Sequence, residues 1–147
     1  DHRDLHLSIR RQRQMCIRDS ICPNQIKKGR AGMREILKKI QEKNSIALMI
    51  DQRVTEGEKV LFFNQPAYTT TIPAQIALKF SSIIVPVSLK RMSDVKFNMV
   101  VEKQIDVERS ENQNKDILDI SIKLNSVMEN MIKNNPDQWI WSHNRWK

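Results

Sequence analysis

Residues 59–89 read KVLFFNQPAYTTTIPAQIALKFSSIIVPVSL, and the predicted fold rests on this stretch. The apolar segment Lys59–Phe63 predicts a short strand, and the polar segment Asn64–Thr71 predicts a loop. Ser82–Leu89 is apolar and rich in β-branched residues, so it predicts a buried strand, with Pro86 at a sheet edge or a strand end. Because the segment between them has a helical pattern, the order of elements indicates an α/β fold.

That intervening segment, Ile72–Phe80, predicts a short helix. Pro73 suits its first turn, where a helix has no use for the backbone N–H that proline lacks. Thr71 suits the N-cap, because its hydroxyl can accept a hydrogen bond from a free backbone N–H. The segment therefore carries its own start signal.

The residues on the N-terminal side predict a helix and then a strand. Arg30–Lys43 is amphipathic, and its apolar residues share one helical face: Met33, Ile36, Leu37 and Ile40. Ser45–Ile50 is a short apolar run after a turn signal and predicts a buried strand. Asp51–Glu58 is polar, so we expect it to form the loop at the carboxyl end of that strand.

The residues on the C-terminal side predict a strand and a long helix. Val95–Val101 alternates partly and should pair antiparallel with Ser82–Leu89, and Asp106–Asn114 reads as a polar connection. Lys115–Lys133 predicts a helix with an apolar face of Ile117, Ile120, Leu124, Met128 and Met131.

A final short helix, Asp137–Trp141, is expected after Pro136, with Asn135 as its cap. Strands alternating with helices predict the α/β class, with a mixed sheet flanked by helices.

The composition excludes several kinds of protein and of site. The chain has 147 residues, 39% hydrophobic and 29% charged, which is typical of about one globular domain. The longest apolar runs, such as Ile46–Ile50, are far shorter than the roughly 20 residues of a membrane-spanning helix. Three Gly argue against a glycine-rich phosphate loop, and Cys16 and Cys22 are too few for a disulfide framework or a four-ligand zinc site. We expect no metal and no cofactor.

Residues 1–20 do not read as protein. Residues 10–19 are what the codons CGT CGG CAG CGT CAG ATG TGT ATA AGA GAC encode, and the whole segment resembles the translation of a sequencing-library adapter. Such a segment is excluded from fold reasoning. We therefore expect residues 1–20 to be non-native and residues 21–147 to be the protein sequence, which then starts abruptly and is incomplete at its N-terminus.

The net charge of +8 points to an anionic partner such as nucleic acid, a membrane surface or an acidic protein. Five Arg and three Asp fall within residues 1–20, so the remainder has a net charge of +6. Two classes of function stay open on composition: an enzyme with an anionic substrate and a basic nucleic-acid-binding module. No helix-turn-helix, zinc-finger or RNA-binding motif favours the second class.

Three blocks carry a family resemblance. They are residues 46–52 (IALMIDQ), residues 62–74 (FFNQPAYTTTIPA) running on to Val87, and the tail of residues 135–147 (NPDQWIWSHNRWK). Together they resemble the lauroyl/myristoyl acyltransferases of bacterial lipid A biosynthesis, over essentially all of residues 21–147. The spacing of the tail, P-x-Q-W-x-W-x-H-x-R-W-K, is the most specific element.

The resemblance implies a glycerol-phosphate-acyltransferase-like α/β fold and a direct acyl transfer. In that family a fatty acyl chain moves from acyl carrier protein, or from coenzyme A, to a hydroxyl of a membrane-embedded saccharolipid. A His-x4-Asp or His-x4-Glu motif supplies the base and the carboxylate that orients it. The resemblance also implies a location at the cytoplasmic face of the bacterial inner membrane.

This chain lacks that dyad. His143 is followed by only four residues, and His2 and His6 have no acid at the motif spacing. We therefore expect the dyad upstream, no catalytic residue in this chain, and no activity of the chain alone.

Six residues are the candidate substrate-binding set: Arg30, Arg34, Asp51, Gln52, Thr70 and Thr71. Asp51 and Gln52 follow a predicted strand, and ligands collect at the carboxyl ends of strands in open α/β sheets. Arg30 and Arg34 suit phosphate or carboxylate groups, and Thr70 and Thr71 precede a helix N-terminus. Each has a simpler interpretation as a polar turn, a solvated helix face or an N-cap.

For the His and Trp residues of the tail, packing within the protein is the first interpretation. His143 has no carboxylate at motif spacing, and Trp139, Trp141 and Trp146 suit a core or a membrane interface. The acyl chain length, the acceptor hydroxyl and the choice of donor are not encoded in any recognisable motif.

Overall fold

The computed structural model describes residues 20, 22, 24–27, 29–55, 57–142 and 144–146. The chain divides into two compact units, Asp1–Ile46 and Ala47–Lys147, which we call the N-terminal and C-terminal units. The adapter-like residues 1–19 and His143 lie outside the described residues.

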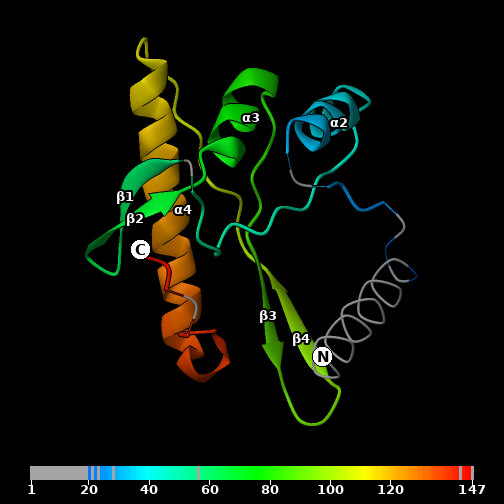
Figure 1. Cartoon of the computed structure of the whole chain (residues 1–147), viewed down its shortest axis with the longest axis vertical. Helices are drawn as coiled ribbons and strands as arrows, with labels where there is room; N and C mark the ends of the chain where they lie inside the picture. The colour runs from blue at the N-terminus through cyan, green and yellow to red at the C-terminus, as the bar shows by residue number, and fades with distance from the viewer. Residues whose placement is uncertain are drawn as a thin grey trace, which may run out of the picture. The chain divides into compact units, whose positions relative to one another are not determined.

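The N-terminal unit contains α2, Arg30–Gln41 (Figure 1), which confirms the helix expected from Arg30. Gly29 precedes it with a φ of 111°, a backbone conformation that suits glycine. A Cβ on Gly32 would clash with the carbonyl oxygen of Lys27, so the chain before the helix packs directly on this residue.

The strand expected at Ser45–Ile50 is absent, and this prediction was wrong. The segment has no regular secondary structure, and Met49 is 80% exposed. The described residues offer no neighbouring strand to complete its backbone hydrogen bonds. An apolar run forms a strand only where such a partner exists.

The C-terminal unit begins with a β-hairpin formed by β1, Glu58–Phe62, and β2, Gln65–Thr69. The expected loop at Asn64–Thr71 was therefore wrong over most of its length. Phe63 and Asn64 form the turn with φ values of 50° and 60°, as a two-residue hairpin requires. The backbone N–H of Phe63 donates to Glu129 Oε1 at 2.7 Å, which ties the turn to a distant element.

Helix α3, Ile72–Phe80, has the expected bounds and contains Pro73 in its first turn. Thr71 occupies the N-cap position, but its hydroxyl makes no capping bond. The capping role predicted for Thr71 was wrong, because the Thr70 hydroxyl instead accepts from the backbone N–H of Ile72 at 3.4 Å.

The second hairpin pairs β3, Val87–Arg91, with β4, Phe97–Val101, in the expected antiparallel sense. The buried strand expected over Ser82–Leu89 is shorter and shifted towards the C-terminus. Ile84 forms only an isolated bridge to Ile105. Pro86 directly precedes β3, where it removes no ladder bond. Every residue of β4 is exposed, so this strand is not part of a buried sheet.

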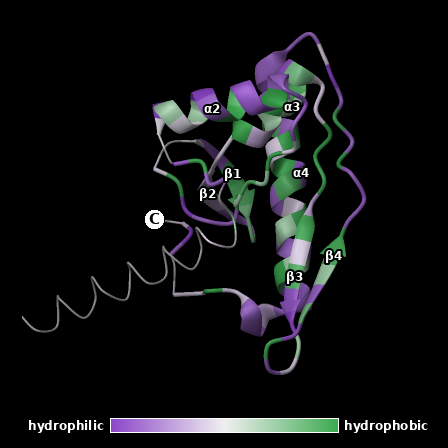
Figure 2. Cartoon of the chain, turned by 90° about the vertical axis from the view of Figure 1, so that its right-hand side faces the viewer, coloured by the Kyte–Doolittle hydropathy of each residue, from purple (hydrophilic) through white to green (hydrophobic). Residues whose placement is uncertain are grey.

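Helix α4, Gln113–Asn134, confirms the long C-terminal helix. The Asn112 side chain caps it by accepting from the backbone N–H of Lys115 at 3.1 Å. Figure 2 shows hydrophobic and hydrophilic residues alternating along α4, as expected of an amphipathic helix. The apolar face packs against α3 and β1, both of which lie beside α4 in Figure 1.

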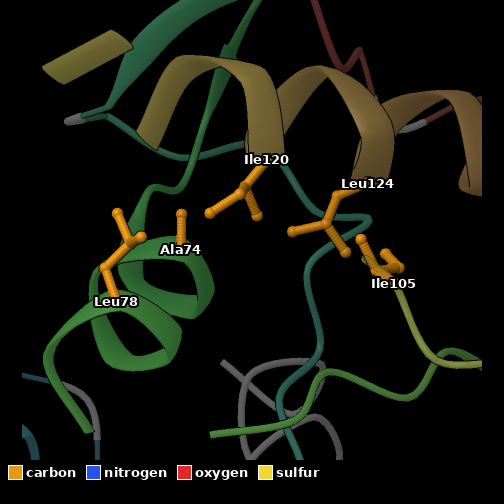
Figure 3. Packing of buried hydrophobic residues seen from close by; sticks show 5 residues of the cluster. All are labelled: Ala74, Leu78, Ile105, Ile120 and Leu124. Atoms are coloured by element: carbon orange, nitrogen blue, oxygen red, sulfur yellow. The ribbon is translucent and has the colours of Figure 1, made fainter. Parts of the chain in front are cut away.

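Two apolar clusters form along this face. The first joins α3 to α4 and consists of Ala74, Leu78, Ile105, Ile120 and Leu124, shown in Figure 3. The second joins the first hairpin to α4 and consists of Phe62, Ala67, Met128 and Ile132. Ile50 packs against both clusters, so the start of the C-terminal unit is fixed although it is not a strand.

The expected final helix is only a 3₁₀ turn, η1, Pro136–Gln138, and Asn135 forms no side-chain cap. The tail beyond it is held by aromatic contacts. Trp139 and Trp146 pack on Phe62 with ring centroids 5.9 Å and 5.8 Å away, and the Trp146 indole donates to the Phe62 carbonyl at 2.9 Å. The packing interpretation of these two Trp residues is confirmed.

The α/β class is confirmed by these helices and strands. The described strands form two separate antiparallel pairs.

Ile120 is 2% exposed at the centre of the first cluster, whereas Ile122 on the same helix is 47% exposed. We expect Ile120→Ala to lower the free energy of unfolding by about 2–5 kcal/mol, because it leaves a cavity. Ile122→Ala should stay within about 0.5 kcal/mol of the parent chain. Urea unfolding measures both, and equal losses in the two variants would contradict the packing described.

Asp116 in the first turn of α4 accepts from the Ser110 hydroxyl at 2.6 Å and from the Ser110 backbone N–H at 2.8 Å. These hydrogen bonds lower the pKa of the Asp116 carboxyl. A carboxyl with a lowered pKa stabilises the fold above its unfolded pKa of about 3.9, and this stabilisation is lost as the pH falls through the lowered value.

We therefore expect Asp116→Asn to lose less stability than the parent chain on acidification from neutral pH through this range. Ser110→Ala should flatten the same profile in part, because it removes the hydroxyl donor. Ser126→Ala, an exposed change on the same helix, is the control. Chemical unfolding at a series of pH values checks this, and parallel profiles for all variants would refute it.

Candidate functional site

The candidate site lies at the edge of the first hairpin, where a buried polar cluster forms around Thr69. Thr69 is 2% exposed, and Asn125 and Arg145 are each 1% exposed. They come from β2, from α4 and from the C-terminal tail. Buried polar groups persist only when they bond to one another, so the cluster fixes these three segments together.

The Thr69 hydroxyl uses its whole hydrogen-bonding capacity. It donates to the Ala67 carbonyl at 3.2 Å and accepts from Asn125 Nδ2 and from an Arg145 guanidinium nitrogen, each at 3.1 Å. Asn125 Nδ2 also donates to the Leu61 carbonyl at 3.0 Å. The other terminal nitrogen of Arg145 donates to the Tyr68 carbonyl. The hairpin is therefore bonded to both α4 and the tail.

Asp51 adjoins this cluster. Its side chain is half-buried, and its Oδ1 is buried with no hydrogen-bond partner among the described residues. Burial lowers the pKa of the Arg145 guanidinium, and the negative charge of Asp51 opposes that shift. Gln52, the next residue, is exposed. The structure thus places Asp51 within electrostatic range of Arg145.

Thr70 and Thr71 are half-buried at the start of α3, and their hydroxyls are occupied locally. Thr70 accepts from the backbone N–H of Ile72, and Thr71 accepts from Gln75 Nε2 at 3.0 Å. Of the predicted set, Asp51, Gln52, Thr70 and Thr71 lie in the C-terminal unit.

Arg30 and Arg34 belong to the N-terminal unit, on α2, and both are exposed. Among the described residues neither forms an ion pair, whereas Lys38 and Lys39 on the same helix pair with Glu42. Their guanidinium groups are therefore accessible to solvent and to an anionic partner.

Asn125 is a site residue that the sequence analysis missed. It occupies the buried face of α4 beside Leu124, where an apolar residue is the ordinary choice. A polar amide at a core position of an amphipathic helix was the signal, because such a group is kept only with hydrogen-bond partners.

The cluster offers a carboxylate, a guanidinium, an amide and a hydroxyl. The hydroxyl, amide and guanidinium are buried and bond within the protein, so the groups near the cluster that are accessible to a polar molecule are Asp51 and Gln52. All three His residues fall outside the described residues, so the described part assembles no histidine base. It also contains no group of His, Cys, Asp and Glu side chains that could hold a metal ion. No helix among the described residues is both long enough and apolar enough to cross a membrane.

Comparison with known proteins assigns the chain to a family. The sequence model of the family described as bacterial lipid A biosynthesis acyltransferase matches residues 9–147. No curated protein matches the chain. The family match spans nearly the whole sequence and agrees with the resemblance carried by the tail. The chain therefore belongs to the bacterial lipid A biosynthesis acyltransferase family.

Proposed function

We propose that this chain forms the acceptor-side part of an enzyme that transfers a fatty acyl group to a hydroxyl of a lipid A precursor or related membrane glycolipid. The observation that carries this proposal is the family match over residues 9–147. The donor in the proposal is an acyl thioester of acyl carrier protein or of coenzyme A. Family membership favours this function over the nucleic-acid-binding alternative.

The reaction forms an ester C–O bond and breaks the thioester C–S bond. The acceptor hydroxyl loses a proton to a general base, and the departing thiolate regains one. The oxyanion that forms in between needs a nearby hydrogen-bond donor or cation. A base with a pKa near neutrality is therefore essential.

We assign that base to a His-x4-Asp or His-x4-Glu dyad carried by polypeptide outside this chain. The support is that no such motif occurs in the 147 residues. It follows that the chain alone is inactive in acyl transfer.

Asp51 and Gln52 are the proposed contacts to the acceptor. Asp51 is half-buried within electrostatic range of Arg145, and Gln52, the next residue, is exposed. A carboxylate and an amide can bind the hydroxyl groups of a sugar. Thr70 and Thr71 would line the same region at the N-terminus of α3, with hydroxyls already ordered by Ile72 and Gln75.

Arg30 and Arg34 are the proposed contacts to an anionic group of the donor or the acceptor. Both are exposed and unpaired within the described residues, and α2 also carries Lys38 and Lys39. Acyl carrier proteins are acidic, and lipid A precursors and anionic headgroups are negatively charged. Electrostatic attraction to these partners at the cytoplasmic face of the inner membrane completes the proposal.

The proposal predicts what lies upstream in the genome. Reading the source DNA upstream of residue 21 should give an open frame that encodes the dyad, in place of the codons for residues 1–20. The uninterrupted enzyme should transfer labelled acyl groups from acyl carrier protein to a lipid A precursor, and the 147-residue chain alone should transfer none.

The family match begins at residue 9, inside the adapter-like segment. The DNA sequence upstream of residue 21 therefore decides whether residues 1–20 belong to the protein. A genomic frame that continues through residues 1–20 as printed would refute the adapter assignment. Acyl transfer by the chain alone would refute the assignment of the base to other polypeptide.

If Asp51 binds the acceptor, removing its negative charge should impair acyl transfer. In the uninterrupted enzyme, Asp51→Asn should lower kcat/KM by about tenfold or more, equivalent to about 1.4 kcal/mol of transition-state binding, mainly through the KM of the acceptor. Asp94→Asn is the matched control, because Asp94 lies in the exposed turn between β3 and β4. Steady-state kinetics with varied acceptor measure both, and equal rates for the two variants would contradict the role.

A further inference from the structure

The buried guanidinium of Arg145 needs a negative charge nearby, and its hydrogen bonds do not supply one. The side chain is 1% exposed, yet it forms no direct ion pair within the described part of the chain. An arginine stays charged at neutral pH. A buried charge is costly unless an opposite charge lies near it, so the surroundings of Arg145 must supply one.

Three contacts hold the guanidinium in one orientation. Its terminal nitrogens donate to the Tyr68 carbonyl and to Thr69 Oγ1, and its carbon lies 5.5 Å from the centre of the Phe62 ring. The Nε atom is buried without a hydrogen-bond partner among the described residues. The group is therefore held in one orientation, and its Nε–H is not used by the hydrogen bonds that hold it.

The loop that follows Ile50 is packed against the same elements. Ile50 contacts the cluster of Phe62, the ring beneath Arg145. At the other end of the loop, a Cβ on Gly57 would clash with the carbonyl oxygen of Thr69, the residue that Arg145 binds. Both ends of Asp51–Gly57 are therefore fixed next to the segments that hold the guanidinium.

Asp51 is the charge that this arrangement supplies. Its Oδ1 is buried and lacks a partner within the described residues, just as Arg145 Nε does. One group is a hydrogen-bond acceptor with a negative charge, and the other is a donor with a positive charge. The negative charge of Asp51 favours the charged form of the Arg145 guanidinium and so raises its pKa against the effect of burial.

We propose that Arg145 is the positioning residue of Asp51: the charge of its anchored guanidinium keeps the Asp51 carboxylate in the orientation that receives the acceptor. This inference rests on the proposed function, which assigns Asp51 to the acceptor side. It gives the tail a task beyond packing, because the tail carries Arg145 back to the start of the C-terminal unit.

A purely structural role for Arg145 predicts different behaviour. If Arg145 only clamps the tail to the hairpin, its substitution should weaken the fold equally in the parent chain and in the Asp51→Asn variant. If Arg145 positions Asp51, the two substitutions should interact, because each removes the charge that acts on the other.

The first experiment is a double-mutant cycle in this chain, with Asp51→Asn, Arg145→Gln and the double variant compared by urea unfolding. We expect a coupling of about fivefold or more in the unfolding equilibrium constant. Asp51→Asn combined with Lys123→Met is the control, because Lys123 pairs with Glu108 at 2.8 Å and not with Asp51. Additive effects of Asp51→Asn and Arg145→Gln would overturn the inference.

A second measurement avoids substituting the buried arginine. The Nε–H resonance of Arg145 should shift in Asp51→Asn and stay in place in Asp94→Asn, because only the first change removes a charge near the guanidinium. An unshifted resonance in Asp51→Asn would also overturn the inference. This readout stands even if Arg145→Gln does not fold.

Kinetics of the uninterrupted enzyme separate this inference from the proposed function. Asp51→Asn and Arg145→Gln should each raise the acceptor KM by a similar factor, and the double variant should be no worse than either. Arg145→Lys, which keeps the charge, should restore part of the loss. If Asp51→Asn impairs transfer and Arg145→Gln does not, the positioning role fails alone. If neither changes transfer although they couple in stability, the acceptor-side role of Asp51 fails, and with it the functional part of this inference.

Discussion

Burial of one face of α4 is the interaction on which the C-terminal unit depends. Ile120 and Leu124 pack against Ala74 and Leu78 of α3, and further along the helix Met128 packs in the cluster of the first hairpin. A two-stranded hairpin and a nine-residue helix are marginal by themselves in water. Their order comes from this shared helix face.

The same helix face carries the polar group that shapes the candidate site. Asn125 lies among the buried apolar residues and bonds both to the Leu61 carbonyl and to Thr69. Thr69 in turn accepts from Arg145 of the tail. Because each of these groups is costly to bury alone, the hairpin, the helix and the tail have one arrangement in which all three bond together. The loop after Ile50 is held against that arrangement.

In our proposal, two tasks of acyl transfer are separated. Asp51 and Gln52 bind the acceptor, and the buried cluster of Thr69, Asn125 and Arg145 gives a rigid support. Proton transfer belongs, in our proposal, to a dyad on other polypeptide of the enzyme. A rigid polar cluster suits the first task, because a reacting hydroxyl must be held within about 0.5 Å of its productive position.

The three helices and the family could be predicted from the order of amino acids alone. The positions of α2, α3 and α4 follow from apolar residues at helical spacing and, for α3, from Pro73 in its first turn, and neither signal needs a distant partner. Three blocks of sequence together, of which the tail at residues 135–147 is the most specific, indicated the acyltransferase family, and the family match confirms it. The threonines before α3 were also accessible as candidates because they adjoin that helix, whereas Asp51 was chosen as the end of a strand that the structure lacks.

The strands and the centre of the site depended instead on tertiary contacts. The turn at Phe63 and Asn64 has no glycine, and its positive φ angles are held by Glu129, so no local signal indicated the first hairpin. Ser45–Ile50 reads as a strand, yet a strand needs a neighbour that an apolar run does not specify. Arg145 and Asp51 lie at opposite ends of the C-terminal unit in sequence. Only folding relates them, because Arg145 packs on Phe62 and bonds to Thr69, while Ile50, the neighbour of Asp51, packs against the cluster of Phe62.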